Sequence, residues 1–451
     1  MKIVIVGDGK MGFALSRLLS GEGHDVTIID SNLDILGKTT NLLDVSCIQG
    51  NGVSIPVQVE AGVPEAELLI AVTSKDEVNI ICCLVAKKLG ARHTIARVRS
   101  PEYAQSLLYI REELGLSMVI NPELETATEI SRLLRFPTAL KIDFFAKGKI
   151  ELLEFKIAEG SPLVGQALHS LRSNFHAKVL ICAVQRGEEV SIPDGEFVLQ
   201  EGDTVSVTAS PKDITSFFRA IGIFVQKTRT VMIVGGGKIS YYLAHQLSES
   251  GIQVKIIEID RERCEALVEQ LPKIMVIHGD GSDQEVLLEE NLDAMDAFVA
   301  LTGMDEENIF ISMFANLHQV GKVVTKINHV NLSGILQKTG IECVVTPHQI
   351  SASQIVRYVR AMQNSLGSNI ESLIKMVDGK VEALEFRVKE SFSGLDVPLK
   401  EIRLKKGLLI ASIIRGSKVI YPSGDDCIRA KDSVIVVTAI SGLRELNDIL
   451  E

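Results

Sequence analysis

The stretch from Lys2 to Asp30, KIVIVGDGKMGFALSRLLSGEGHDVTIID, decides the fold. It begins with a run of β-branched residues from Ile3 to Val6, which predicts a buried strand. The run breaks at the glycine-rich segment Gly7–Gly12, and apolar residues then recur at helical spacing. A second apolar run ends on Asp30, 18 residues beyond Gly12 (30 − 12). Strand, glycine turn, helix, strand and acid in this order are typical of a dinucleotide-binding fold.

Each residue type in this stretch has a physical role. Gly7 suits the tight turn, Gly9 lets the backbone approach a phosphate, and Gly12 lets the helix pack closely on its strand. The first amides of the helix would face the phosphates, and the Asp30 carboxylate would accept hydrogen bonds from ribose hydroxyls while repelling a 2′-phosphate. The alternative is a glycine turn in an α/β domain that binds no ligand.

Strands and helices continue to alternate after Asp30, which predicts a doubly wound parallel sheet. Ligands of such sheets bind outside the carboxyl ends of the strands. Those ends give the predicted cofactor-binding residues of this part of the chain, which are Gly7, Asp8, Gly9, Lys10, Met11, Gly12, Asp30, Asn51, Thr73, Ser74 and Arg97.

Two of these positions have a plain structural alternative. The segment Ser74–Glu77 fits a capping box, so its hydroxyl could satisfy helix amides instead of a ligand. Arg97 could be a solvated charge at a strand end, or it could contact a phosphate or ribose.

Composition limits the function. The chain has 451 residues, a net charge of −11 and no tryptophan, and an acidic chain without a basic stripe argues against nucleic-acid binding. Its seven cysteines have no CxxC spacing and its nine histidines are dispersed, so we expect reduced thiols in the core and no metal site. No secretory signal or apolar run of about 18 residues is found, so we expect a soluble cytoplasmic protein that reaches a membrane only through a partner.

The pattern of predicted secondary structure changes in the second quarter of the chain. Residues 122–139 have the apolar spacing of a helix that ends near Pro137. From Leu140 to about Gly222, short alternating strands and glycine turns predict a small β-rich domain in which no nucleophile, base or metal cluster stands out.

The chain then repeats itself. Val231–Lys238 copies Ile3–Lys10 at an offset of 228 (235 − 7), and Glu258 copies Asp30 at the same offset (258 − 30). The second set of predicted cofactor-binding residues is Gly235, Gly236, Gly237, Lys238, Ile239, Glu258, Asp280, Thr302 and Lys326. A period of this length indicates a duplicated two-domain unit and not a solenoid. A lysine in the first helical turn of both copies opposes the helix dipole, which favours phosphate beside it.

The copies differ at positions that matter for a ligand. Ser240 stands in place of the last fingerprint glycine, Asp280 in place of Asn51, and Lys326 in place of Arg97. The two sites could therefore differ in affinity or in ligand.

These patterns predict an α/β chain with two doubly wound Rossmann domains, each followed by a small β-rich α+β domain. The expected order is a Rossmann domain at 1–121, a linking helix at 122–139, a small domain at 140–222, a second Rossmann domain at 228–348, a second linking helix at 349–368 and a second small domain at 369–451.

The motifs and their order resemble the TrkA family, the regulatory subunits of Trk potassium uptake systems, over essentially the whole chain. Their domains are called RCK (or KTN) and TrkA-C domains. The resemblance is carried by Gly7–Gly12, Asp30, Thr73–Asn79, Ile95–Tyr103, Asn121–Glu123, Gly235–Ile239, Glu258, Gly279–Gly281 and Thr302.

The resemblance implies a cytoplasmic protein, peripheral on the inner face of the membrane, that binds NAD(H), ATP or ADP as regulatory ligands. It implies a homo-oligomeric ring, a dimer or tetramer, beneath a TrkH/TrkG-like potassium transporter. Because the β-rich domains offer no catalytic constellation, we expect no catalytic residues and no enzyme. The alternative is an NAD-dependent oxidoreductase with duplicated cofactor domains, for which His169 and His176 are the available proton donors.

Overall fold

The computed structural model describes residues 1–135, 139–145, 150–175, 179–222, 228–328, 340–341, 343–365, 370–377, 380–416, 418–440, 442–443 and 445–451. These residues form two compact units, and each unit draws on both halves of the chain. The first unit contains Met1–Ser131 and Arg229–Val356, and the second contains Arg132–Thr228 and Arg357–Glu451.

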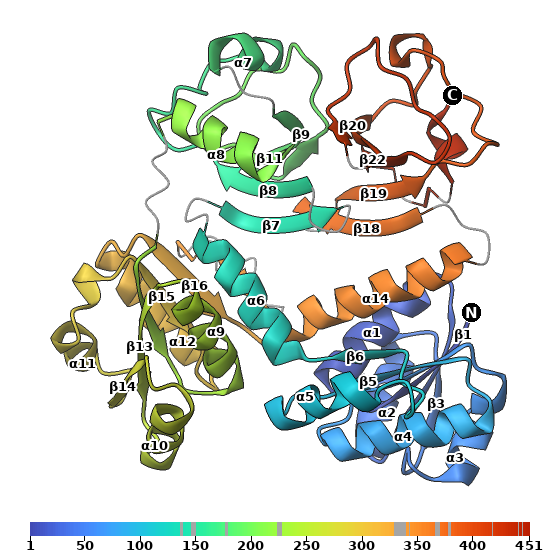
Figure 1. The fold of residues 1–451 in the computed structure, drawn as a ribbon, viewed down its shortest axis with the longest axis vertical. Coiled ribbons are helices and arrows are strands. Elements are labelled where there is room, and N and C mark those ends of the chain that lie inside the picture. Colours follow the sequence, from blue (N-terminus) through green and yellow to red (C-terminus); the bar gives the residue numbers. More distant parts are fainter. Residues whose placement is uncertain are drawn as a thin grey trace. The chain divides into compact units, whose positions relative to one another are not determined.

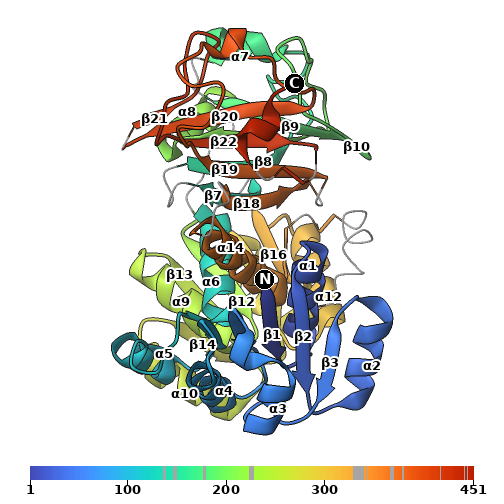
Figure 2. The ribbon, with the colours of Figure 1, turned by 90° about the vertical axis from the view of Figure 1, so that its right-hand side faces the viewer.

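The first unit begins with a six-stranded parallel sheet in the order β3-β2-β1-β4-β5-β6 (Figures 1 and 2). This is the doubly wound order, with the switch point between β1 and β4. Its elements are β1 (Lys2–Val6), α1 (Lys10–Gly21), β2 (Asp25–Asp30), α2 (Leu33–Leu42), β3 (Ser46–Gln49), α3 (Ile55–Glu60), β4 (Leu68–Ala71), α4 (Asp76–Leu89), β5 (His93–Arg97), α5 (Pro101–Ile110), β6 (Met118–Ile120) and α6 (Pro122–Arg135).

The second half of the chain gives the same unit a second parallel sheet, in the equivalent order β14-β13-β12-β15-β16-β17. Its elements are β12 (Thr230–Val234), α9 (Lys238–Glu249), β13 (Gln253–Glu258), α10 (Arg261–Gln270), β14 (Met275–His278), α11 (Gln284–Glu289), β15 (Ala297–Ala300), α12 (Asp305–Leu317), β16 (Lys322–Lys326), β17 (Val344–Val345) and α14 (Pro347–Ser365). The predicted fold class, with its duplicated Rossmann sheets, is confirmed.

The central strands are apolar throughout because both faces of the sheet are covered. In β4 all four residues are buried, as the unbroken apolar run predicted. Val4, Leu69 and Ala96 pack on one face with Cys82 and Ala86 of α4 in a single apolar cluster. This core fixes the carboxyl ends of β1, β4 and β5, which are the ends that carry the candidate site.

The second unit consists of two five-stranded antiparallel sheets, with the orders β10-β9-β11-β8-β7 and β18-β19-β22-β20-β21. In Figure 2 the strands β20, β22, β19 and β18 are stacked in this order. The elements are β7 (Ala139–Phe145), β8 (Ile150–Lys156), α7 (Leu168–Phe175), β9 (Leu180–Arg186), β10 (Glu189–Ser191), β11 (Thr204–Ala209), α8 (Pro211–Ala220), β18 (Ile370–Met376), β19 (Val381–Arg387), β20 (Leu408–Arg415), β21 (Lys418–Ile420) and β22 (Ser433–Thr438).

The two small domains share one apolar core. A single buried cluster contains Ile150 and Cys182 from the first small domain together with Met376, Ala383 and Val437 from the second. A hydrogen bond from Lys380 Nζ to the carbonyl oxygen of Glu188 (2.7 Å) also joins them. Neither small domain could bury its side of this apolar cluster without the other.

A bidentate ion pair closes the same turn in both small domains. Asp203 is fully buried, and its oxygens accept hydrogen bonds from Nε and Nη2 of Arg186, each at 2.8 Å, and from the amide of Gln200 at 2.9 Å. Asp432 and Arg415 repeat this arrangement in the second half.

We expect Asp203→Asn to lower the free energy of unfolding by about 1.5 kcal/mol, the lower end of the range for hydrogen bonds to charged groups. The lower end applies because Arg186 is 41% exposed, so water can replace part of the lost interaction. Urea unfolding measures the change. Asp194→Asn, on an exposed turn, is the control, and equal midpoints for the two variants would contradict the expected role of the ion pair.

One predicted boundary is wrong. The helix expected over 122–139 is α6, which the structure describes from Pro122 to Arg135, whereas Ala139 already belongs to the strand β7. The apolar residues from Ala139 on are too few for their spacing to separate a strand from a helix. In the structure these residues belong to a strand and not to the helix.

Candidate functional site

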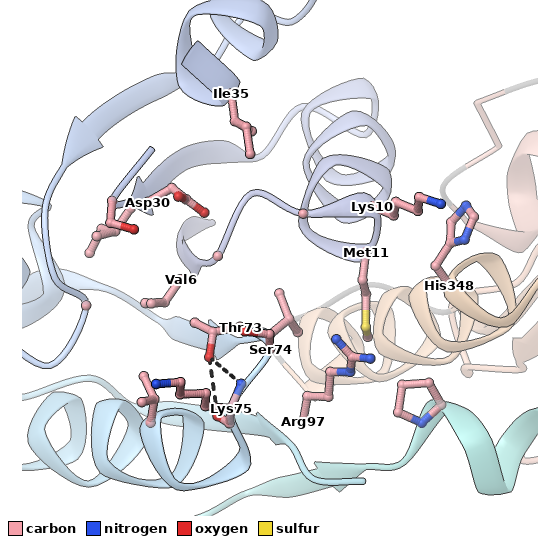
Figure 3. A pocket seen from close by; sticks show the side chains of 18 of the residues that line it. Val6, Lys10, Met11, Asp30, Ile35, Thr73, Ser74, Lys75, Arg97 and His348 are labelled. Carbon is pink, nitrogen blue, oxygen red and sulfur yellow. Dashed lines mark hydrogen bonds between the residues drawn. The ribbon is translucent and has the colours of Figure 1, made fainter. Parts of the chain in front are cut away.

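A pocket of about 840 Å³ opens at the carboxyl ends of the first parallel sheet (Figure 3). Its volume lies within the range of about 300–1,000 Å³ that small-molecule sites occupy. Predicted site residues that line it are Gly7, Gly9, Lys10, Met11, Asp30, Asn51, Thr73, Ser74 and Arg97 from the first half, with Ile239 and Lys326 from the second. The structure thus brings most of the first-half set together.

The glycine turn is shaped as the sequence predicted. Gly7 has a φ of +100°, which favours glycine, and its amide donates to the carbonyl oxygen of Ile29 (2.8 Å). A Cβ on Gly12 would lie 1.9 Å from the carbonyl oxygen of Gly7, so only glycine fits this backbone. Gly9 is the N-cap of α1 and supplies no capping side chain, which leaves the first-turn amides open toward the pocket.

The Asp30 carboxylate is held at one end of the pocket by two backbone amides. Its Oδ2 accepts from the amide of Asp8 (2.7 Å) and its Oδ1 from the amide of Asn32 (2.8 Å). Each carboxylate oxygen has a second lone pair. The group is therefore oriented in advance and can still accept hydrogen bonds from ribose hydroxyls.

A buried asparagine fixes the middle of the pocket. Asn79 is fully buried, and its Oδ1 accepts from the amide (2.8 Å) and hydroxyl (2.7 Å) of Thr73. Its Nδ2 donates to the carbonyl oxygen of Arg97 (2.9 Å). One side chain thus ties the end of β4 to the end of β5 and places Thr73 and Arg97 beside each other.

The opposite end of the pocket is formed where the two halves meet. Arg97 Nη2 lies 3.8 Å from Oε1 of Glu123, at the start of α6. Lys326, Asn328 and His348 reach the same pocket from the second half. Burial lowers the pKa of Lys326, Asp305 opposes this shift, and Lys10 of the first half adds to it, so charges of both halves act on one another here.

Some first-half predictions do not point into the pocket. The Asp8 side chain is buried and accepts a hydrogen bond from the Thr39 hydroxyl (2.6 Å), and burial raises its pKa. Gly12 packs on the turn. The capping box at Ser74–Glu77 is wrong, because Lys75 is the N-cap of α4 and makes no side-chain capping bond. The hydroxyl of Ser74 is therefore not used as a cap.

The second half of the chain forms a similar glycine turn, but different side chains surround it. Gly235 has a φ of +97°, and Glu258 accepts from the amides of Gly236 (2.5 Å) and Asp260 (2.8 Å). Arg263 occupies the position of Ile35 in the repeat (263 − 35 = 228), and its Nε donates to the carbonyl oxygen of Gly236 (2.7 Å). A guanidinium thus stands where the first half presents an apolar pocket wall.

The remaining second-half predictions lie away from the first pocket. Lys238 lines a smaller pocket of about 350 Å³ together with Ser100, Tyr241 and Arg263. Asp280 accepts from the hydroxyl (2.7 Å) of Ser282, which lowers its pKa. Gly235, Gly237 and Thr302 stay at the turn and strand end of their own sheet, where Thr302 is held by Asn308 (2.8 Å).

The sequence interpretation missed several pocket residues, among them Ile35, Lys75, Glu123, Asn328 and His348. A signal existed for two of them. Pro122-Glu123 and Pro347-His348 each follow the last strand of a Rossmann sheet and open a long helix, so aligning the repeats to their ends would have paired Glu123 with His348.

No group of three or more metal-ligating side chains occurs among the described residues. In the same part of the chain, no helix has the length and apolar character needed to cross a membrane. Of the two histidines named for an oxidoreductase, His169 is the second residue of α7 in the second unit, with its Nδ1 2.9 Å from the carbonyl oxygen of Gly195, and His176 lies outside the described residues.

Comparison with known proteins agrees with this architecture. The sequence matches the family model of the TrkA-N domain over residues 3–122 and 231–347, and that of the TrkA-C domain over residues 152–222 and 384–451. Among solved structures, the GsuK RCK domain has a TM-score of 0.62 at 18% identity and covers 96% of this chain and 91% of its own. The GsuK channel bound to NAD has the same TM-score and identity over 97% of this chain and 76% of its own.

Curated relatives match along the full length. The Trk system potassium uptake protein TrkA of Halomonas elongata is 34% identical over 439 residues, which are 97% of this chain and 95% of the relative. The TrkA homolog of Archaeoglobus fulgidus is 32% identical over 449 residues and covers both chains completely. With both domain models matched in each half and relatives above 30% identity throughout, the chain belongs to the TrkA family of Trk system potassium uptake proteins.

Proposed function

We propose that this chain is a cytoplasmic regulatory subunit that binds an adenine nucleotide in the first-half pocket and thereby controls a membrane potassium transporter of the TrkH/TrkG kind. The observation that carries the proposal is the pocket itself. It joins the glycine turn, the open amides of α1 and an oriented Asp30 carboxylate at the switch point of the sheet. Family membership supplies the connection to potassium uptake.

The proposed mechanism is thermodynamic linkage. A nucleotide that binds one conformation of a ring of such chains more tightly than another shifts the ring toward the first, by no more than its difference in affinity. The pocket suits this role because Arg97 and Glu123 come from the first half, while Lys326 and His348 come from the second. A movement between the two Rossmann domains would therefore change the site.

NAD(H), ATP and ADP are the proposed ligands. Asp30 accepts ribose hydroxyls, and Ile35 offers an apolar wall for an adenine ring, which all of these ligands carry. The likeness to a channel whose structure is described as bound to NAD is in keeping with this class. His169 is not among the described residues that line the pocket, and no observation of the described residues supports the oxidoreductase alternative.

Potassium uptake in cells tests the proposal. Cells lacking the protein are expected to take up potassium several-fold more slowly at low external potassium. A plasmid copy of the natural chain should restore uptake, and Asp30→Ala should not. Lys273→Glu, an exposed charge change distant in sequence from the fingerprint, is the control and should restore it. Normal uptake without the protein, or full rescue by Asp30→Ala, would refute the regulatory role of the pocket.

A further inference from the structure

A buried carboxylate lies behind the glycine turn of the first half. Asp8 stands between Gly7 and Gly9 and is only 2% exposed, although it does not line the pocket. Its Oδ2 accepts a hydrogen bond from the hydroxyl of Thr39 on α2 (2.6 Å), whereas its Oδ1 is buried and has no hydrogen-bond partner in the described part of the chain. A buried carboxylate with one unpaired oxygen is costly in its ionised form. The turn thus contains an acid that the proposed ribose and phosphate contacts do not use.

The groups that face Asp8 favour its neutral form. Burial raises the pKa of Asp8, the hydrogen bond from Thr39 opposes this rise, and the charge of Asp30 adds to it. Cys47 of β3 is also close, and its thiol stays protonated in neutral solution because burial raises its pKa as well. No lysine or arginine among the described residues forms an ion pair with Asp8. The carboxyl therefore faces a carboxylate, a hydroxyl and a thiol.

Asp8 lies close to the place where the proposed phosphate binds. Lys10 is the first residue of α1, and its Cα is at most about 7.6 Å, or two steps of about 3.8 Å, from that of Asp8. A phosphate on the first-turn amides would lie at a similar distance, about one Debye length at physiological salt, and partly buried charges are screened less than charges in solution. An ionised Asp8 therefore opposes the phosphate, and a protonated Asp8 does not.

The second half contains no equivalent of this acid. Gly236 occupies the position of Asp8 (236 − 8 = 228), and Leu267 occupies that of Thr39 (267 − 39 = 228). Leu267 is fully buried, and an added Cβ on Gly236 would lie 2.7 Å from its Cδ1, so apolar atoms fill the space beside the second turn. Because the second turn still forms, with Gly235 at a φ of +97°, neither the carboxyl nor its hydroxyl donor is needed to shape such a turn.

We propose that Asp8 makes nucleotide binding in the first-half pocket depend on pH, with its protonated form binding the nucleotide more tightly than its ionised form. This inference rests on the proposed function and adds a second signal to it. The sign follows from linkage: a bound phosphate favours the neutral carboxyl, so binding takes up a proton and affinity rises as the pH falls. The rise begins at the pKa of Asp8 in the complex and is complete below its lower pKa in the free protein.

Calorimetric titration of the full chain with NAD at several values between about pH 5 and pH 8 tests the proposal. NAD is the probe because each of its two phosphates is esterified and stays singly charged throughout this range. We expect affinity to rise about fivefold toward the acid end, the lower end of the usual range for coupling between two sites. Titrations in two buffers of different ionisation enthalpy should show net proton uptake on binding.

Two variants and a matched control assign the effect to one residue. Asp8→Asn removes the charge but keeps an oxygen for Thr39, so NAD should bind with the affinity of the acid end at every pH and without proton uptake. Thr39→Val removes the hydroxyl that opposes the raised pKa of Asp8, so the rise in affinity should begin at a higher pH. Asp44→Asn makes the same chemical change at an exposed position and should follow the natural chain. The series is repeated with His348→Gln, which removes the imidazole of the pocket, and the step that depends on Asp8 should remain.

The outcomes separate this inference from the proposed function. If the natural chain binds neither NAD nor ADP at any pH, the proposed function fails and this inference fails with it. If Asp8→Asn binds NAD with the same pH dependence as the natural chain, only the role of Asp8 is overturned. A pH dependence that disappears with His348→Gln alone would also overturn it, because the imidazole would then be the titrating group. Should ligand-free melting show that Asp8→Asn is unfolded, Asp8→Gly, which copies the second turn, takes its place, and Thr39→Val tests the shift independently.

Discussion

Asp30→Ala is expected to remove most of the stabilisation that a saturating nucleotide gives to this protein. A ligand at one hundred times its dissociation constant stabilises the folded state by about 2.7 kcal/mol. Alanine removes the ribose acceptor and also the two hydrogen bonds from the amides of Asp8 and Asn32 that orient the turn. Thermal unfolding at increasing ATP, ADP, NAD and NADH concentrations measures the loss.

The second half provides a matched control for this experiment. Glu258 accepts from the backbone amides of Gly236 and Asp260, as Asp30 does from its own turn, but it does not line the first pocket. Glu258→Ala should therefore keep most of the nucleotide-dependent shift while losing a similar set of backbone hydrogen bonds. An unchanged shift in Asp30→Ala, or an equal loss in Glu258→Ala, would contradict a site confined to the first-half pocket.

Gly12→Ala is expected to lower the free energy of unfolding by about 3 kcal/mol, the upper end of the usual range for overpacking. The added Cβ would lie 1.9 Å from the carbonyl oxygen of Gly7, and a backbone atom cannot move aside as a flexible side chain can. The turn would have to open, so nucleotide affinity should fall as well. Urea unfolding and nucleotide titration of the same variant measure both effects.

The duplicate turn again supplies the comparison. Ser240 occupies the position of Gly12 (240 − 12 = 228), and its hydroxyl donates a hydrogen bond to the carbonyl oxygen of Gly235. The second turn has thus adapted to a side chain, and Ser240→Gly should cost less than half as much as Gly12→Ala. Similar melting curves for natural protein and Gly12→Ala would show that the turn relaxes easily and would refute the steric argument.

The periodicity of the chain was sufficient to predict the fold. The apolar runs at Ile3–Val6 and Leu68–Ala71 can only be buried on both faces, and with helical spacing between them they specify a doubly wound sheet. The long offset between Gly7 and Gly235 then fixed the duplication. Residue 139 was assigned to the helix, whereas Ala139 belongs to β7, because periodicity alone does not separate strand from helix over so few apolar residues.

The site was predictable only where local sequence determines it. The pocket is lined by Gly7, Gly9, Lys10, Met11 and Asp30, as predicted. These positions were predictable because residues close in the chain determine the glycine turn and the end of the strand. Lys326 was assigned to the second half, whereas it lines the pocket of the first. For His348 the local signal was only its place after the last strand of the second sheet, and its presence in this pocket depends on how two domains separated by more than a hundred residues pack together.

The shared core of the small domains has a consequence for the way this molecule assembles. Ile150 and Cys182 of the first small domain are buried in one cluster with Met376 and Val437 of the second. Two separate half-length chains would have to associate by diffusion to form this cluster, whereas here both domains belong to one covalent chain. Tethering replaces a concentration-dependent association with a high effective concentration. The paired unit therefore survives dilution, and its two copies are free to diverge in sequence, as Ser240 and Lys326 differ from Gly12 and Arg97.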